Sequence, residues 1–295
     1  MFYLLFGNYL VERSAISETD YLAVKHKVQE TNVKLGLLAM SEGLMTLTQA
    51  NEVNRLQACM DKRFGDIATE KGYLNKEQVD HLLSLQETSY SKFIQLLVNK
   101  NLLTLDQIAI YLKDYQSLKG YTDSQMATLK SEDNEAVIPI LLQLESQMHS
   151  ELISLTIRNL IRFIDPEIYV TNSYIANDYV FENLAIQAAT GDHNIQLGFS
   201  GNQESLLQIA TIFADEEFTE IDADSYDAIC EFINCINGLY ATKLSEEDIN
   251  IDMLPPYFYA NQKMKCNNLV VVTVNFSDYT FDLILSIDSP IEYLQ

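Results

Sequence analysis

Basic side chains are scarce in this sequence of 295 residues, which holds 19 Lys and Arg against 42 Asp and Glu. Long apolar runs are missing too, and none approaches the roughly 20 residues that a membrane-spanning helix needs. The apolar start, residues 1–6, lacks a basic flank, so we expect folded chain and not a signal peptide. The four cysteines show no paired spacing, which favours reduced thiols in the cytoplasm: Cys59, Cys230, Cys235 and Cys266.

The negative charge is concentrated in one part of the chain. Residues 1–120 hold 13 basic and 14 acidic side chains, whereas residues 121–295 hold 6 and 28. The acidic part would repel nucleic acid and anionic membranes, so we predict a protein partner, no nucleic-acid binding and no membrane insertion. The length suggests two domains, and the asymmetry suggests that they have different tasks.

Common signatures of metal and cofactor chemistry are also missing. The chain has no Gly-x-x-x-x-Gly-Lys phosphate loop and no arguable Ser-His-Asp arrangement. Its four histidines lie far apart and lack metal-ligand spacing with the cysteines: His26, His81, His149 and His193. We therefore expect no metal site and no cofactor of the protein's own.

The first 116 residues repeat with a period of 29. Each repeat has a turn residue, then a helix-capping residue, then Asp or Gln three positions later. In repeat order these residues are Ser14, Ser17 and Asp20; Gly43, Thr46 and Gln49; Gly72, Asn75 and Gln78; Asn101, Thr104 and Gln107. The pattern predicts a left-handed turn followed by a capped helix, so each unit reads as a short helix, a tight turn and a longer helix. Such units must stack to bury their apolar faces.

These repeats resemble the N-terminal domain of type II secretion and pilus-assembly ATPases. The family pattern runs basic-Leu-Gly, Gly-Leu-Ile and Thr-x-x-Gln, and the best matches here are residues 34–36 (Lys-Leu-Gly) and 63–65 (Arg-Phe-Gly). In some members paired repeats bind cyclic di-GMP. The resemblance thus implies two alternatives: a cyclic di-GMP sensor that uses Lys34 and Arg63, or a helical docking or spacer module.

Beyond the repeats, residues 117–135 are polar and turn-rich, and they predict a linker. The rest of the chain predicts an α/β domain over 136–295, a two-layer sandwich with long helices packed on a mostly antiparallel sheet. Its predicted helices span 136–163, 203–213 and 225–244, and its predicted strands span 182–189, 194–200, 269–276 and 279–287, the last two as a hairpin.

The helix predicted over 225–244 has a polar stripe of unusual composition. Asp227, Glu231, Asn234 and Gly238 fall on one side, opposite an apolar face of Ile229, Phe232, Ile236, Leu239 and Tyr240. Asn and Gly are poor residues for a helix interior, and Gly238 would leave room for another backbone to approach. The stripe is either a functional surface or an ordinary solvated face.

The spacing Asp227-x-x-x-Glu231-x-x-Asn234, followed after 21 residues by Pro256, resembles the signature of the CheC/CheX/FliY chemotaxis phosphatases. One signature is present, as in CheX. The resemblance implies dephosphorylation of the aspartyl phosphate of a CheY-type receiver, which supplies its own Mg²⁺ and lysine. Asn234 would orient the attacking water and Glu231 would pair with that lysine, with Asp227, Gly238 and Pro256 in support. It also implies a homodimer.

One position departs from the family pattern. A small residue usually precedes the Asn, but this chain has Ile233. Its branched side chain would either obstruct the receiver or pack into the edge of the core. The alternative to a phosphatase is a non-catalytic scaffold that binds a receiver or a secretion or pilus partner, and a scaffold should tolerate Ala in place of Asn234.

Overall fold

The computed structural model describes residues 1–57, 62–144 and 146–294, so Cys59 lies outside the described residues. The chain divides into two compact units, one of residues 2–133 and one of Met1 with the chain from Asn134 onward. The second unit begins two residues before the start predicted at Ala136. None of the helices among the described residues is both long and apolar enough to cross a membrane.

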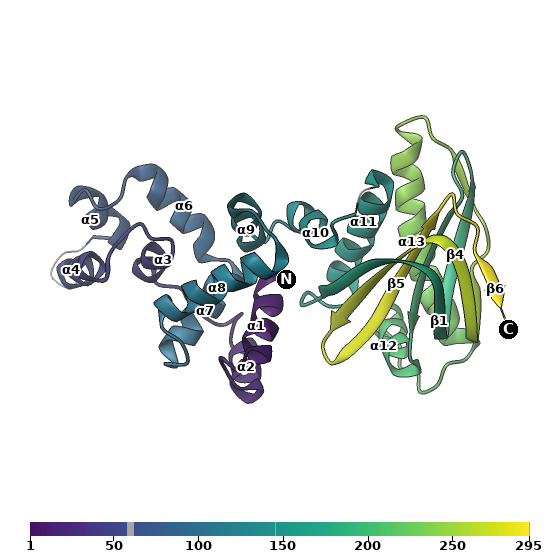
Figure 1. The fold of residues 1–295 in the computed structure, drawn as a ribbon, viewed down its shortest axis with the longest axis horizontal. Helices are drawn as coiled ribbons and strands as arrows, with labels where there is room; N and C mark the ends of the chain where they lie inside the picture. The colour runs from purple at the N-terminus through teal and green to yellow at the C-terminus, as the bar shows by residue number, and fades with distance from the viewer. Residues whose placement is uncertain (58–61, 145, 295) are drawn as a thin grey trace. The chain divides into compact units, whose positions relative to one another are not determined.

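Residues 2–133 form the helical unit (Figure 1). Its helices are α1 (Phe2–Glu12), α2 (Glu18–Lys25), α3 (Leu35–Ser41), α4 (Leu47–Gln57), α5 (Phe64–Glu70), α6 (Lys76–Gln86), α7 (Ser89–Asn99), α8 (Leu105–Lys119) and α9 (Asp123–Lys130).

The turns and caps of this unit lie at the predicted positions. The backbone is left-handed at the four turn residues, with φ of 55° at Ser14, 68° at Gly43, 71° at Gly72 and 53° at Asn101. Each cap side chain accepts the backbone N–H three residues on: Ser17 from Asp20, Thr46 from Gln49, Asn75 from Gln78 and Thr104 from Gln107. These hydrogen bonds satisfy N–H groups that the first turn of a helix leaves unpaired.

The predicted order of a shorter helix followed by a longer one holds in three of the four repeats. Helices α3 and α5 have 7 residues and precede α4 and α6 with 11 each, and α7 with 11 precedes α8 with 15, but α1 has 11 residues and α2 has 8. Both α1 and α7 begin four residues earlier in the repeat than α3 and α5 do, and each additional turn carries buried aromatic residues: Phe2 and Tyr3 in α1 and Tyr90 in α7. Phe2 packs on Tyr90 with ring centroids 5.4 Å apart, and Tyr3 packs on Phe93 at 5.9 Å. These contacts extend both helices beyond the repeat.

The stretch predicted as a linker, 117–135, is largely helical, although the boundary between the two units falls near its end, after Asp133. This stretch contains the end of α8 and all of α9, and Met126 and Leu129 of α9 are buried. A further turn and cap cause the helix: Gly120 is left-handed with φ 70°, and Thr122 and Gln125 form a capping box.

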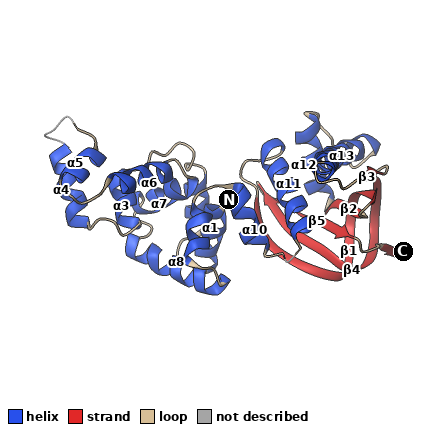
Figure 2. Ribbon diagram, turned by 90° about the horizontal axis from the view of Figure 1, so that it is seen from above, coloured by secondary structure: helices blue, strands red, loops and turns tan. Residues whose placement is uncertain are grey.

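In the second unit, helices α11 (Gln147–Phe163), α12 (Gln203–Ala214) and α13 (Ala223–Ser245) cover one face of a sheet, and α10 (Asn134–Leu142) packs on α11 and β1 at one end of it (Figure 2). The single helix predicted over 136–163 is two helices, because Gln143 takes a left-handed φ of 51° that ends α10. The helices expected over 203–213 and 225–244 are confirmed, each within two residues at either end.

The described strands form a six-stranded sheet in which every pairing is antiparallel, in the order β3-β1-β2-β5-β4-β6. The strands are β1 (Tyr169–Gly191), β2 (Ile195–Gly201), β3 (Ile251–Met253), β4 (Tyr257–Phe276), β5 (Tyr279–Ile287) and β6 (Glu292–Leu294). The predicted hairpin of β4 and β5 is confirmed, with Phe276 opposite Tyr279. The predicted α/β class with an antiparallel sheet is confirmed as well.

Strands β1 and β4 are far longer than predicted and fold the sheet over on itself (Figure 1). They pair with each other from Tyr169 opposite Asn275 to Ile186 opposite Tyr257, in addition to their pairings with β2 and β5. One hydrophobic cluster therefore fills the fold of the sheet and includes Phe181, Leu184, Met264, Leu269 and Ile284. The larger cluster lies between the sheet and the helices and holds α13 in place.

Candidate functional site

A capping box fixes the N-terminus of helix α13. Asp222 is its N-cap and forms a capping box with Ser225. The hydrogen bond from the Ser225 backbone to the Asp222 carboxylate lowers the pKa of Asp222, although the small loss of hydration opposes the shift. The charged cap also interacts favourably with the helix dipole.

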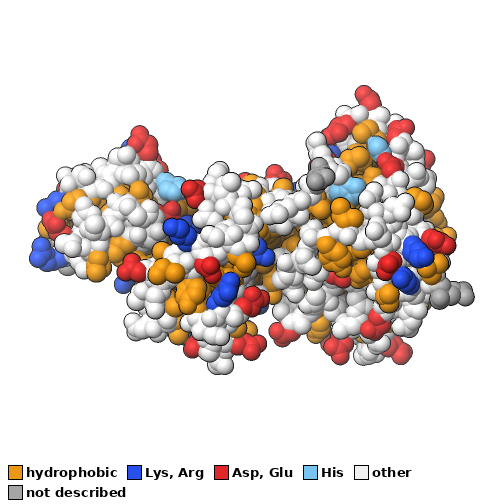
Figure 3. Space-filling model, in the orientation of Figure 1, with side chains coloured by type: hydrophobic (Ala, Val, Ile, Leu, Met, Phe, Trp, Pro, Cys, Tyr) orange, Lys and Arg blue, Asp and Glu red, His pale blue; other side chains and the backbone are white. Residues whose placement is uncertain are grey.

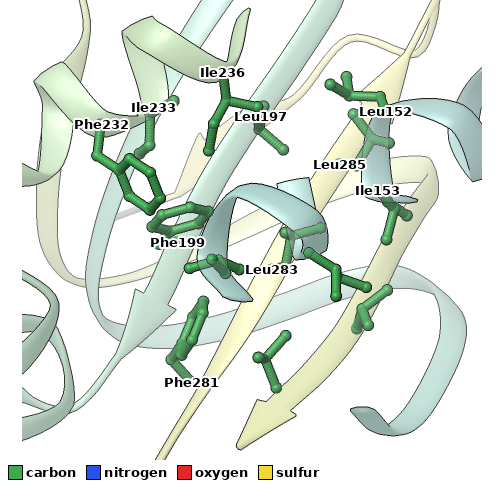
Figure 4. Packing of buried hydrophobic residues seen from close by; sticks show 14 of the residues in the cluster. Leu152, Ile153, Leu197, Phe199, Phe232, Ile233, Ile236, Phe281, Leu283 and Leu285 are labelled. Carbon is green, nitrogen blue, oxygen red and sulfur yellow. The ribbon is translucent and has the colours of Figure 1, made fainter. Parts of the chain in front are cut away.

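The apolar face of α13 packs on the sheet. Figure 4 shows Phe232, Ile233 and Ile236 directed from the helix toward Phe199 and Leu197 of β2. The rings of Phe232 and Phe199 lie 5.9 Å apart. This packing places the opposite stripe of the helix at the surface.

The prediction that Leu239 belongs to the buried apolar face of α13 is wrong, because 51 % of its surface is exposed. The buried stripe instead follows Ile229, Ile233, Ile236 and Tyr240 at steps of three and four residues. Leu239 lies beside that stripe, beyond the area that the sheet covers.

The structure brings all four signature positions to one pocket. Asp227, Glu231, Asn234 and Pro256 line a cavity of about 660 Å³ together with Gln187, Cys230 and residues 253–255. Asp227 and Glu231 are exposed, whereas Asn234 and Pro256 are half-buried. Residues 227–234 come from α13, and 253–256 from β3 and the turn that follows it. A helix face and a turn distant in sequence thus form a single surface.

Gly238 lies one helical turn beyond Asn234 but does not line this cavity. A Cβ atom built there would meet only the methyl group of Met253 within 4 Å, at an ordinary 3.9 Å. No backbone of the described chain outside α13 uses the space that the sequence suggested. The role expected for Gly238 therefore stays a prediction about a partner molecule.

Ile233 is fully buried, with none of its surface accessible, and belongs to the cluster between helices and sheet. Of the two alternatives for this departure from the family pattern, the structure shows the second: the side chain is part of the core. It does not stand between Asn234 and a docking receiver.

Sequence reasoning missed Gln187, a buried residue of β1 whose side-chain amide lies behind Asn234. Its Nε2 donates to Asn234 Oδ1 at 2.8 Å and to the Leu254 carbonyl at 3.0 Å. Its Oε1 accepts from Asn237 Nδ2 at 2.9 Å. A single polar residue within the apolar segment 184–189 was the available signal, because buried polar groups need partners.

The pocket is acidic. Its described lining includes the carboxylates of Asp227 and Glu231 and no Lys or Arg. Burial, reinforced by the charge of Asp227, raises the pKa of Cys230 to about 11, so this thiol stays protonated. Nowhere among the described residues do three or more His, Cys, Asp or Glu side chains gather in a way that could hold a metal ion. Such a site suits a cationic group that a partner brings.

Lys34 and Arg63 also meet at one pocket, in the helical unit. They line a cavity of about 1290 Å³ with two further basic residues, Lys62 and Lys76. Acidic residues share the lining, and Lys62 pairs with Glu70 at 2.6 Å.

The glycines that follow Lys34 and Arg63 in the motif have a packing role. A Cβ at Gly65 would come within 2.8 Å of Val79 Cγ1, and one at Gly36 within 3.0 Å of the Phe64 ring. Close helix packing therefore explains the glycine of each of these two matches.

Comparison with known families now gives the class of the second unit. Residues 184–277 match the family model for chemotaxis phosphatase CheX, a stretch that runs from β1 through α13 to β4 and covers less than half of the chain. The chain thus contains a CheX-family region, and the resemblance predicted for this unit is confirmed there. The resemblance of the repeats to secretion ATPases stays a prediction. No curated protein matches the chain.

Solved structures of similar fold include CheX from Vibrio vulnificus, with 13 % identity and a TM-score of 0.42, over 48 % of this chain and 99 % of that one. CheX from Desulfovibrio desulfuricans gives 14 % identity and a TM-score of 0.42, over 48 % and 99 %. The CheX-CheY-BeF3-Mg²⁺ complex from Borrelia burgdorferi gives 15 % identity and a TM-score of 0.39, over 48 % and 97 %.

Proposed function

We propose that the second unit dephosphorylates the aspartyl phosphate of a CheY-type receiver in bacterial chemotaxis or two-component signalling. The observation that carries the proposal is that Asp227, Glu231, Asn234 and Pro256 line one surface pocket. The pocket belongs to a region that matches the CheX family model.

The residue types fit hydrolysis by orientation. An aspartyl phosphate is a mixed anhydride that already hydrolyses unaided, so positioning a water in line is a sufficient contribution. The amide of Asn234 offers a donor and an acceptor to that water and carries no charge that would repel phosphate. Glu231, three residues before it and exposed, would pair with a lysine of the receiver.

The receiver would bring the Mg²⁺ on which its own phosphoryl chemistry depends, as the resemblance to the chemotaxis phosphatases implies. We further propose that the protein acts in the cytoplasm, where receivers are found, and as a homodimer. Sedimentation velocity of the full chain tests the dimer.

The first experiment measures decay of a phosphorylated CheY-type receiver from the same organism, with and without the protein. Acceleration that Asn234→Ala abolishes supports the proposal. Leu239→Ala, at an exposed position on the same helix that does not line the pocket, is the matched control and should leave acceleration unchanged. Acceleration that survives Asn234→Ala would refute the role of Asn234. Folded protein that accelerates no receiver would favour the scaffold.

A second candidate function concerns the helical unit. Because Lys34 and Arg63 line one pocket, cyclic di-GMP binding there is the activity to test. Calorimetric titration should show binding that Lys34→Ala and Arg63→Ala weaken and that Lys119→Ala, an exposed control in α8, does not. Equal binding by all three variants would exclude this pocket.

A further inference from the structure

Gln187 is an unusual residue for its position. It lies on the face of β1 that packs against the helices, between Ala185 and Ala189, and only 2 % of its surface is exposed. An amide in such a place is costly unless all its hydrogen-bonding groups are satisfied. Three partners satisfy it, and one of them is the proposed catalytic amide of Asn234.

The partners determine which way each amide faces. The Leu254 carbonyl can only accept, so the end of Gln187 that lies 3.0 Å from it must be the NH₂ group. The same NH₂ group lies 2.8 Å from Asn234, which must therefore present its oxygen. At the other end, Gln187 Oε1 requires a donor, and Asn237 Nδ2 supplies it at 2.9 Å.

This arrangement leaves a defined set of groups for a partner. Asn234 Oδ1 has one lone pair engaged by Gln187 and one remaining. Its Nδ2 has only a weak contact with Glu231 Oε2, at 3.4 Å. An unsupported Asn on a helix surface would instead sample several rotamers and both orientations of its amide.

We propose that Gln187 is the positioning residue of this site: it fixes the side chain of Asn234 in the one orientation that directs Nδ2 and the free lone pair of Oδ1 to the reacting water. The inference rests on the proposed phosphatase function. Its physical basis is that a polar group held by a buried partner keeps its geometry before the substrate arrives.

Gln187 also connects this helix to the turn that carries Pro256. The Leu254 carbonyl accepts from Gln187, and the Leu254 N–H donates to the Ala188 carbonyl at 2.8 Å. The turn is thus fixed to β1 at both polar groups of one residue. A substitution of Gln187 should therefore lower the rate of the reaction more than it weakens docking of the receiver, which the exposed Glu231 would mediate.

Two substitutions separate orientation from packing. Gln187→Glu keeps the shape but replaces the NH₂ donor by an acceptor, so Asn234 must turn its amide over to donate. Gln187→Met keeps the length and removes both kinds of hydrogen bond. In receiver-dephosphorylation assays we expect both to lower kcat about tenfold to a hundredfold, with KM changed by less than about twofold. Gln196→Glu, a half-buried glutamine of β2 whose side chain contacts Tyr293, is the matched control and should keep kcat.

Gln187→Glu gives a readout that a merely structural role would not produce. Protonation of the new carboxyl restores one donor, so part of the lost kcat should return as the pH falls through its pKa. Burial should raise that pKa, and so should the carboxylates of Asp227 and Glu231, the other acids lining the pocket. The other titratable group in the described lining of the pocket is the thiol of Cys230. Strand β3 and the turn of residues 254–256 contribute no titratable side chain to this described lining. The wild type, measured over the same pH range, should show no such recovery.

The side-chain amide signals of Asn234 in ¹H–¹⁵N NMR spectra, assigned by their loss in Asn234→Ala, test positioning without any activity. We expect one sharp pair of signals in the full-length protein, shifted and broadened by Gln187→Met. Full kcat in Gln187→Met would overturn the inference. If the wild type accelerates no receiver, the proposed function fails, and the NMR result alone decides: unchanged Asn234 signals in the variant overturn positioning, and altered signals uphold it.

Discussion

Replacing Ile233 by Ala tests whether this residue belongs to the core or to the docking surface. The side chain is completely buried among apolar neighbours of α13 and the sheet. The substitution removes three carbon atoms, which costs about 2.4 kcal/mol in transfer free energy alone. The cavity left behind raises the expected loss in the free energy of unfolding to about 3–4 kcal/mol.

The free energy of unfolding is measured in urea, with hydrogen–deuterium exchange as the probe. Peptides from α13 and β5 are analysed, because they report on the second unit alone. Leu239→Ala is the control on the same helix. Its side chain is 51 % exposed, so its substitution should change the free energy of unfolding by less than about 0.5 kcal/mol.

Receiver dephosphorylation by folded Ile233→Ala should equal that of the wild type, because the side chain is directed away from the pocket. A different pair of results would refute the reasoning. If Ile233→Ala costs less than about 1 kcal/mol and increases dephosphorylation, the residue must face the receiver after all.

Two further predictions concern titratable groups of α13. Iodoacetamide should modify the exposed Cys235 of the native protein before the buried Cys230 and Cys266. The rate at Cys235 should rise toward alkaline pH, since burial and Glu231 raise the pKa of this thiol; peptide mapping that finds Cys230 modified equally fast would contradict this. The pKa of Asp222 is lowered in the folded state, so its contribution to stability should be present above the ordinary value of 3.8 and be lost as the pH falls through the lowered one. Asp222→Asn should remove that part of the pH dependence in urea titrations, and an unchanged pH profile would count against the cap.

The features that the sequence predicted best depend on neighbours in the chain. The cap at Thr104 requires only the N–H of Gln107, three residues on, so spacing alone locates it. The same local spacing occurs at Gly120 and Thr122, where a left-handed residue precedes a helix cap. Helix α9 therefore begins within a stretch that is rich in turn-forming residues. The signature of α13 also survives, because helical spacing places Glu231 and Asn234 on one side whatever the helix packs against.

The features that could not be predicted depend on distant pairing. The outer part of β1 carries polar and exposed residues such as Asn172 and lacks the alternation of a half-buried strand. It becomes a strand because β4 provides the matching edge, with Asn172 opposite Thr273. Gln187 illustrates the same limit, since its partner Asn234 lies on another element.

The pairing of β1 with β4 has a consequence for how the chain is made. The helical unit is complete by Asp133, so it can fold while the ribosome is still translating the rest. Strand β1 follows, but its outer part cannot pair until β4 has been synthesised, since Val170 lies opposite Val274. A long stretch of unpaired strand edge therefore waits for the last part of the chain. Conditions that slow translation of this last part of the chain should therefore promote aggregation of the nascent protein before they affect protein that has already folded.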